Sequence, residues 1–342
     1  MELSQLKEKL KSGDLRGWYI FAGEEDYLKK HYLGELRRAV VTDDTFALFN
    51  HTVYDGQAID LASLAEAIKA PPMMGEYKLI EWRFANIEAM KDGERKALSE
   101  LFSLKDEYPC AIFAILTTED GLDVQNPQRP SRLVSSLKEG FDILAFPKST
   151  DSQLASWMKR HFEAAGLTID MRTAEAMLFR VGHSMEVLSS EIDKLSAIMK
   201  VRGVTQVTPA IVEEVTSSTV ECDAFALSNA ITEKNTEKAF RALTDLKARR
   251  VEPFTVISML ERSYAELLSV SLLLSEGKEA KDIESILNLH PYKTKLAIGA
   301  AKRLGGARIS SALDGIRKID SAAKSGGLGG YTAIEIFITQ NV

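Results

Sequence analysis

Three carboxylates follow a single glycine at the place where many nucleotide-binding chains wrap a phosphate group. The stretch WYIFAGEEDYLKKHYLGELRRAV predicts a buried strand, a tight turn and a helix, a layout whose helix-start N–H groups can bind phosphate. The phosphate-binding pattern is GxxxxGK(S/T), but this turn has only Gly23, and no lysine followed by serine or threonine opens the helix. Glu24, Glu25 and Asp26 suit the positive end of the helix dipole and would repel phosphate. We therefore expect no bound nucleotide and no other cofactor.

Residues for hydrolytic or metal chemistry are equally poorly placed. The run Ala111–Thr117 predicts a strand that could carry a catalytic acid, but Glu119 and Asp120 follow it only after two threonines. The histidines share no HExxH or comparable metal-ligand spacing. They are His31, His51, His161, His183 and His290. No GxSxG nucleophile motif is present. We expect no catalytic residue and no metal site, and an enzyme would need a site assembled only by folding.

An apolar pair occupies a proline corner in KAPPMMGEYKLIEW, residues 69–82. Without further information, Met73 and Met74 on such a loop are most often part of the core. Pro71 and Pro72 favour a second interpretation, because a stiff backbone lowers the ordering cost of docking to a partner. Both interpretations stay open on these residues alone.

A basic stretch without acids lies at residues 285–313. Its cations are Lys293, Lys295, Lys302, Arg303 and Arg308. It could be a solvated helix face, a contact with an acidic neighbouring subunit or a contact with DNA. The DNA alternative has the least support, because only Tyr292 interleaves the charges.

Composition describes an ordinary globular protein of two or three domains. The chain has 342 residues, of which 45% are hydrophobic and 27% charged, and it lacks the run of roughly 18 apolar residues that a membrane span needs. We expect a cytoplasmic protein with no membrane partner. The net charge is −6, divided into −8 for residues 1–215 and +2 for residues 216–342. Nucleic acid is therefore at most a secondary, indirect or weak partner.

The elements that position these residues change in kind along the chain. Up to residue 147, short apolar runs alternate with helical patterns, which predicts βαβ units around a mostly parallel sheet. The predicted strands are Trp18–Ala22, His51–Tyr54, Lys78–Trp82, Ala111–Thr117 and Phe141–Phe146, and the predicted helices are Asp26–Val40, Leu61–Ile68, Glu94–Leu104 and Ser131–Leu137.

After FPKSTDSQ the strand signals stop. Ser149 or Asp151 can cap a helix that runs to Ala165, and short helical patterns continue to Ser217. From about Val220 every periodic segment is helical, with the longest helix expected over Pro253–Leu274. The sequence thus predicts an α/β domain, a small helical domain and a larger helical domain.

Six stretches in a fixed order resemble the delta-subunit family of bacterial DNA polymerase III clamp loaders. They are FAGEEDYL (21–28), APPMMGEYKLIEW (70–82), LSSEIDKL (188–195), EPFTVISMLERSYAELL (252–268), LHPYKTKLAIGAAKRL (289–304) and IDSAAKSG (319–326). No single stretch is specific, but the ordered set covers nearly the whole chain.

The resemblance implies an α/β plus all-α protein with three domains. These are an AAA+-type α/β sandwich with a parallel sheet and no functional P-loop (residues 1–147), a helical lid domain (148–217) and a helical collar oligomerisation domain (218–342). It implies a non-catalytic subunit of the DNA polymerase III holoenzyme, in a pentamer with gamma/tau ATPase subunits and delta-prime. This subunit would bind the beta sliding clamp and help to open it for loading on primed DNA. Alternatives are an active AAA+ ATPase of the same fold and a helical scaffold unrelated to replication.

The resemblance also assigns residues. In this family two neighbouring hydrophobic side chains bind an apolar pocket of the clamp, and by position these are Met73 and Met74, after Pro71 and Pro72. The family pair is more often Leu or Phe in character, so methionine is a departure. The charge pattern, and not the resemblance, makes Lys293, Lys295, Lys302 and Arg303 the candidates for a contact with a neighbouring subunit.

Overall fold

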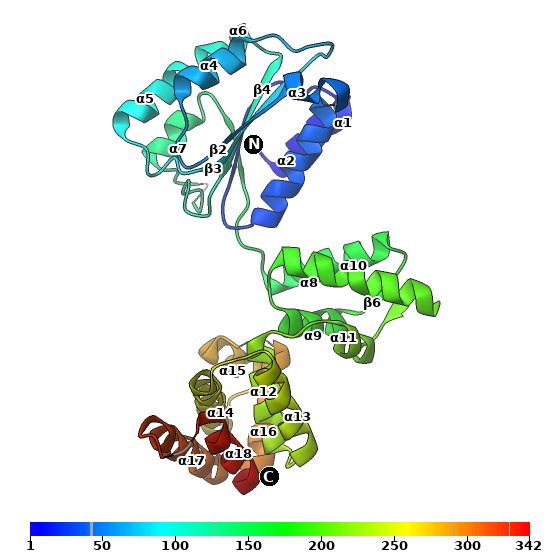
Figure 1. The fold of residues 1–342 in the computed structure, drawn as a ribbon, viewed down its shortest axis with the longest axis vertical. Helices are drawn as coiled ribbons and strands as arrows, with labels where there is room; N and C mark the ends of the chain where they lie inside the picture. Colours follow the sequence, from blue (N-terminus) through cyan, green and yellow to red (C-terminus); the bar gives the residue numbers. More distant parts are fainter. Residues whose placement is uncertain (42–43, 127, 290, 328) are drawn as a thin grey trace. The chain divides into compact units, whose positions relative to one another are not determined.

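The structure, a computed structural model, describes residues 1–41, 44–126, 128–289, 291–327 and 329–342. The described residues form two compact units, Met1–Ser149 and Thr150–Val342 (Figure 1). None of the helices in these ranges is both long enough and apolar enough to cross a membrane. The division into three domains, with boundaries after residues 147 and 217, stays a prediction.

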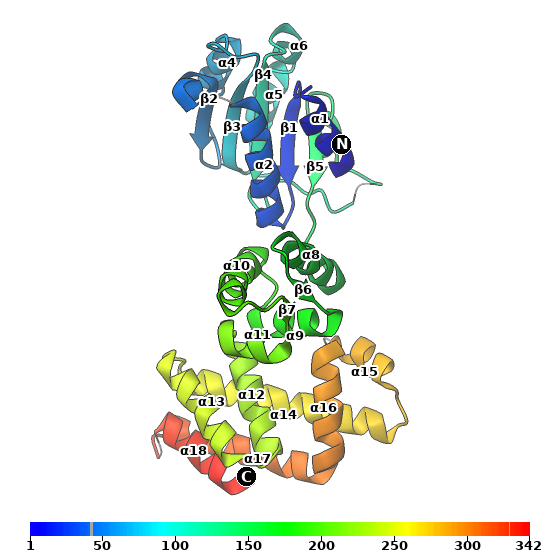
Figure 2. The same cartoon turned by 90° about the vertical axis from the view of Figure 1, so that its right-hand side faces the viewer.

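The first unit is built on a parallel sheet (Figure 2). In the described part of this unit, five strands lie in the order β2-β3-β4-β1-β5. Their bounds are β1 (Trp18–Ala22), β2 (His51–Asp55), β3 (Lys78–Ala85), β4 (Ala111–Thr117) and β5 (Asp142–Ala145). All five lie where the apolar runs predict them, and the parallel α/β architecture expected from the sequence is confirmed.

Helices cover both faces of this sheet. They are α1 (Leu3–Ser12), α2 (Asp26–Val40), α3 (Ala47–Asn50), α4 (Leu61–Lys69), α5 (Asp92–Glu100), α6 (Ser103–Glu107) and α7 (Arg132–Leu137), with a 3-10 turn, η1, at Asp44–Phe46. Side chains alternate along each strand, so β1 sends Trp18 and Ile20 toward α4 and α7, and Tyr19 and Phe21 toward α1 and α2. The result is a sandwich with one apolar core on each side of the sheet.

The predicted helix Glu94–Leu104 is wrong in extent, because the chain forms α5 and α6 with a break between them. The break lies at Leu101 and Phe102, where the Leu101 N–H donates to the Leu98 carbonyl, a tighter turn than an α-helix makes. Phe102 packs edge-on against Phe141, with ring centroids 5.6 Å apart. We attribute the end of α5 to the packing of the Phe102 ring against Phe141. The spacing of apolar residues within the helix does not reveal this contact.

A buried ionic cluster joins the middle of the sheet to α2. The Glu81 carboxylate on β3 is fully buried and accepts hydrogen bonds from Arg37 Nε (2.7 Å) and Nη2 (2.9 Å). His51 Nε2 lies 2.9 Å from the same carboxylate, and Arg83 Nε donates to it at 2.7 Å. A buried charge with this many partners is well compensated. The cluster therefore fixes the start of β2 against β3.

The second unit begins with helices around a very small sheet. Its first elements are α8 (Asp151–Ala164), β6 (Thr168–Ile169), α9 (Met171–Val181), α10 (Met185–Arg202), β7 (Gln206–Val207) and α11 (Pro209–Val215). The expectation that strands stop after residue 147 is wrong, because β6 and β7 pair in parallel. Two-residue strands are too short to produce an alternating pattern.

The residue that caps α8 is Thr150, whose hydroxyl accepts a hydrogen bond from the Gln153 N–H. The prediction that Ser149 or Asp151 caps this helix is therefore wrong.

The rest of the second unit is helical, as predicted. The helices are α12 (Val220–Thr232), α13 (Thr236–Ala248), α14 (Pro253–Ser275), α15 (Ala280–Leu287), α16 (Pro291–Leu304), α17 (Gly306–Lys324) and α18 (Gly330–Asn341). They share one apolar core, in which Tyr264 of α14 packs edge-on against Phe337 of α18. The long helix expected over Pro253–Leu274 is confirmed as α14.

Candidate functional site

The proline corner lies at one edge of the sheet, between the end of α4 and the start of β3. In a parallel sheet all strands begin at the same edge, so the corner lies at the amino edge. The acidic turn after β1 lies at the opposite, carboxyl edge. The proline corner and the acidic turn are therefore separated by the length of the strands.

A buried lysine fixes the chain where it leaves α4. The ammonium group of Lys78, the first residue of β3, donates to the carbonyls of Ala67 and Ala70 at the end of that helix. A cation there satisfies carbonyls that have no helical partner and matches the negative end of the helix dipole. Burial lowers the pKa of Lys78. The hydrogen bonds to the two carbonyls hold its amino group in place. Ala70 is extended, as expected before a proline, so the chain leaves the helix in a defined direction.

A side-chain amide fixes the next part of the corner. Asn50 Nδ2 donates to the Met73 carbonyl at 2.8 Å, and the Met73 N–H donates to Asn50 Oδ1 at 2.7 Å. Asn50 is only 7% exposed, so these two bonds satisfy an amide that would otherwise be buried without partners. The side-chain amide thus pairs with both the N–H and the carbonyl of one residue, as the backbone of a neighbouring strand would. We call these paired bonds the Asn50 clip.

Both methionines point away from the core. Met73 is 45% exposed and Met74 84% exposed, so the alternative that they are core residues of this chain is wrong. Met74 also has φ 54°, a left-handed conformation that an unbranched side chain adopts only at a cost. The corner thus presents two flexible apolar side chains on a backbone held by Lys78 and Asn50.

Two further apolar side chains, missed by the sequence analysis, are exposed next to the clip. Leu48 is 89% exposed and Phe49 58% exposed, and they directly precede Asn50 in the single-turn helix α3. The only sequence signal was a pair of large apolar residues outside any strand or helix period. We call Leu48, Phe49, Met73 and Met74 the apolar corner group.

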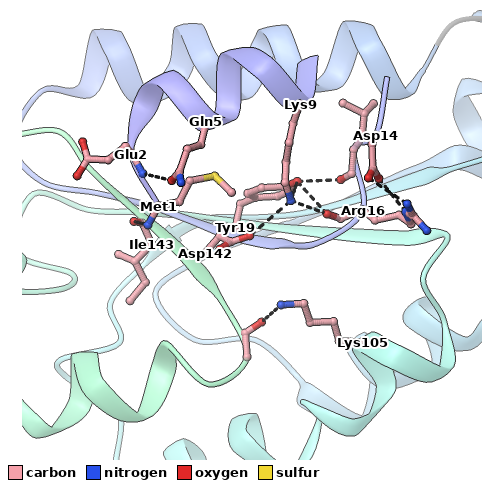
Figure 3. Close-up of polar contacts among 12 residues, drawn as sticks. Met1, Glu2, Gln5, Lys9, Asp14, Arg16, Tyr19, Lys105, Asp142 and Ile143 are labelled. Atoms are coloured by element: carbon pink, nitrogen blue, oxygen red, sulfur yellow. Dashed lines mark hydrogen bonds and ion pairs between the residues drawn. The ribbon is translucent and has the colours of Figure 1, made fainter. Parts of the chain in front are cut away.

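A wide, open hollow of about 600 Å³ lies beside the corner. The residues that line it are Ser12, Gly13, Asp14, Arg16, Glu76, Tyr77, Pro109 and Cys110. Toward the end of α1, Lys9 Nζ donates to the carbonyl of the lining residue Arg16 (2.9 Å) and to the Tyr19 hydroxyl (3.3 Å) (Figure 3). Arg16 forms a bidentate ion pair with Asp14, in which Nε donates to Oδ1 at 2.7 Å and Nη2 donates to Oδ2 at 3.0 Å. Hydrogen bonds and an ion pair therefore order the chain around Arg16 on this side of the corner.

At the carboxyl edge, the turn that could have held phosphate is closed by the protein itself. Gly23 has φ 115°, and a Cβ there would lie 2.4 Å from the Phe146 carbonyl oxygen, so glycine serves close packing of two chain segments. The Glu25 N–H donates to the same carbonyl at 3.0 Å. Lys29 is fully buried and donates to the Thr117 carbonyl (2.9 Å) while pairing with Asp26 (2.8 Å). Gly23, the Glu25 N–H and Lys29 therefore already make contacts within the protein, and they are not available to hold a phosphate group.

The cavity that remains at this edge is acidic. It has a volume of about 280 Å³ and is lined by Gly23, Leu122 and Val124, among others. Among the described lining residues, every titratable side chain is a carboxylate: Glu24, Glu119, Asp120 and Asp123. A triphosphate carries several negative charges, so this site does not fit the nucleotide that the fold would imply.

Calorimetry with ATP and Mg²⁺ is therefore expected to give no heat beyond dilution with the purified chain. The reason is the acidic lining together with the lysine that is already bonded to Thr117. A P-loop ATPase measured in the same buffer provides the positive control. Saturable binding of ATP would support the alternative of an active ATPase.

The basic residues predicted to contact a subunit do not behave alike. Lys293 on α16 pairs with Glu266 and lies 5.8 Å above the Phe225 ring, so it is engaged within the chain. Lys295, Lys302 and Arg303 are exposed and form no ion pair with any residue that the structure describes. His290 lies outside the described residues. The structure thus leaves three of the four predicted cations available.

Comparisons with known proteins show what this chain is similar to. Residues 221–341 match the family model for the C-terminal domain of the DNA polymerase III delta subunit. The chain is 22% identical over 337 residues to a DNA polymerase III subunit delta of Bacillus subtilis (strain 168), covering 97% of this chain and 95% of that one. A solved Bacillus subtilis DNA clamp loader delta protein has the same fold, with a TM-score of 0.58, 21% identity and 98% of each chain covered. These likenesses confirm the resemblance predicted from the sequence.

Proposed function

We propose that this chain, whose residues 221–341 match the family model for the C-terminal domain of the DNA polymerase III delta subunit, binds the sliding clamp and helps to open it for loading on primed DNA. The observation that carries the proposal is the exposed pair Met73 and Met74 on a fixed corner. In this proposal the pair inserts into an apolar pocket of the clamp.

The energetics of such docking suit a reversible partner. Burying both methionine side chains would contribute about 3–6 kcal/mol before the costs of association. The Asn50 clip and the bonds of Lys78 reduce those costs, because the backbone of the corner is ordered before the partner arrives. The flexible thioether chain can fit an irregular pocket, although it loses more rotamer freedom than a branched chain. The corner is thus suited to bind and release.

The proposed mechanism is mechanical. The acidic cavity at the carboxyl edge argues against nucleotide binding by this chain, so ATP hydrolysis is left to the gamma/tau partners. These partners and delta-prime would assemble with residues 218–342 of this chain into a pentamer in the cytoplasm. When the partners hold the pentamer in its active shape, docking of the corner would strain one interface of the ring. DNA would meet this chain only indirectly or weakly.

Co-purification with the sliding clamp tests the proposal. A stable complex of the purified chain with the clamp on size-exclusion chromatography is the expected result. Failure to bind the clamp, both alone and within the assembled loader, would sink the proposal and favour a scaffold unrelated to replication.

Charge reversal on α16 tests the proposed subunit contact. Lys295→Glu with Lys302→Glu is expected to weaken assembly with the ATPase subunits by about tenfold, because two exposed cations would then repel an acidic neighbour. The matched control is Lys278→Glu with Lys281→Glu, two exposed lysines near α15. Assembly is measured by sedimentation at low and high salt. Equal assembly of the two double variants would contradict this contact.

A further inference from the structure

We propose that Asn50 is a positioning residue for clamp binding, which joins α3 to the corner so that the whole apolar corner group forms one docking surface. The inference rests on the proposed function, and it extends the docking surface from two residues to four. It assigns a role to Leu48 and Phe49, which neither the family resemblance nor the sequence analysis singles out.

The chemistry of the clip requires an amide. The Met73 backbone offers one donor and one acceptor, and the Asn50 side chain supplies the matching acceptor and donor at 2.7 and 2.8 Å. An aspartate keeps the shape and the acceptor but cannot donate to the Met73 carbonyl, while a leucine offers neither. Gly75 supports the same geometry, because a Cβ there would lie 3.2 Å from Asn50 Nδ2. Few side chains could replace this amide.

The base of the clip is rigid. Asn50 ends α3, and His51 begins β2 in register with Leu79 of β3. His51 also contacts the buried Glu81 carboxylate at 2.9 Å. The clip therefore ties the corner to the sheet and does not merely join two loops.

The clip also acts on the conformation of Met74. This residue follows the clipped Met73 and lies at φ 54°, with 84% of its surface exposed and no burial to stabilise that conformation. A left-handed methionine persists when the neighbouring residues hold it in place. Release of Met73 would let Met74 return to ordinary backbone conformations and lose its direction.

A single occupant accounts for all four side chains. Asn50 is the next residue after Phe49 and is bonded to the backbone of Met73, so the two apolar segments are held side by side. A partner that covers Met73 and Met74 would therefore meet Leu48 and Phe49 as well. We assign all four to the same apolar surface of the sliding clamp.

The test compares Asn50→Asp and Asn50→Ala with the wild-type chain. Both variants are expected to bind the clamp about tenfold more weakly or worse. Residues 70–77 should exchange amide hydrogens faster in both variants, while β1 and β4 keep wild-type protection. Faster exchange confined to the corner distinguishes positioning from general loss of structure. Wild-type affinity in Asn50→Asp, or faster exchange throughout the first unit, would overturn the inference.

A second variant removes apolar surface without touching the clip. Leu48→Ser is expected to weaken clamp binding by about fivefold or more, with no change in thermal unfolding because the side chain is 89% exposed. The matched control is Val201→Ser on α10, which is also 89% exposed and should bind like the wild type. If the wild type binds and only a Met73 and Met74 variant loses binding, the proposed function stands and this inference fails. If the wild type does not bind, the proposed function itself fails.

Discussion

Replacing Met73 and Met74 together by glutamate is expected to lower the affinity for the sliding clamp by at least about a hundredfold, equivalent to about 2.7 kcal/mol. The double variant loses the burial of two apolar side chains and would have to place two carboxylates in an apolar pocket. Folding should be unaffected, because the side chains are 45% and 84% exposed and the clip uses only the Met73 backbone. Surface plasmon resonance on immobilised clamp measures the change.

The matched control for this variant is Met171→Glu. Met171 is 46% exposed, nearly the same as Met73, but it begins α9 in the second unit. It should bind the clamp like the wild type, and both variants should still assemble with the ATPase subunits. Clamp affinity within a factor of about three of the wild type in the double variant would refute the assignment of the corner.

Glu81→Ala is expected to destabilise the first unit by about 3–5 kcal/mol, since it leaves Arg37, His51 and Arg83 without the carboxylate they share. The exposed parts of the two arginines can find water, which places the effect toward the lower end of that range. Urea unfolding followed by tryptophan fluorescence reports the change, because Trp18 and Trp82 are fully buried in this unit. Glu66→Ala, which removes an exposed ion pair with Lys69, is the control and should change stability by less than about 1 kcal/mol.

The same carboxylate predicts a dependence on pH. Burial alone would raise the pKa of Glu81, but hydrogen bonds from His51, Arg37 and Arg83 outweigh it and lower the pKa to about 2. The folded protein therefore holds Glu81 ionised more strongly than the unfolded chain, whose glutamate pKa is near 4.5. The stabilisation is fully present above pH 4.5 and is lost as the pH falls from there to about 2. Glu81→Gln should remove this part of the acid dependence, so a wild-type acid profile in that variant would argue against the cluster.

The sheet was predictable because a parallel strand buried on both faces is a continuous apolar run. Ala111–Thr117 shows this most clearly, since every residue of β4 is buried and its predicted bounds are correct. The break between α5 and α6 was not predictable, because it depends on the packing of Phe102 against Phe141, 39 positions further along the sequence. Strands as short as β6 leave no periodic pattern at all.

The candidate site was predictable only in part. Met73 and Met74 could be found because prolines mark the corner and because the family resemblance assigns the position. Asn50 could not, because its partner lies 23 residues away and an asparagine before a strand resembles an ordinary turn residue. The engagement of Lys293 was equally hidden, since Glu266 comes from a different helix.

The two cysteines give this chain a built-in place for a fluorescent label. Cys110 lines the hollow beside the corner, together with Glu76 and Tyr77, and is partly exposed. Cys222 is buried, and burial raises the pKa of its thiol to about 11, so it is a poor nucleophile at neutral pH. A maleimide dye added to the unmodified protein would therefore react mainly at Cys110. Its emission would report the arrival of a partner at the amino edge without any engineered residue.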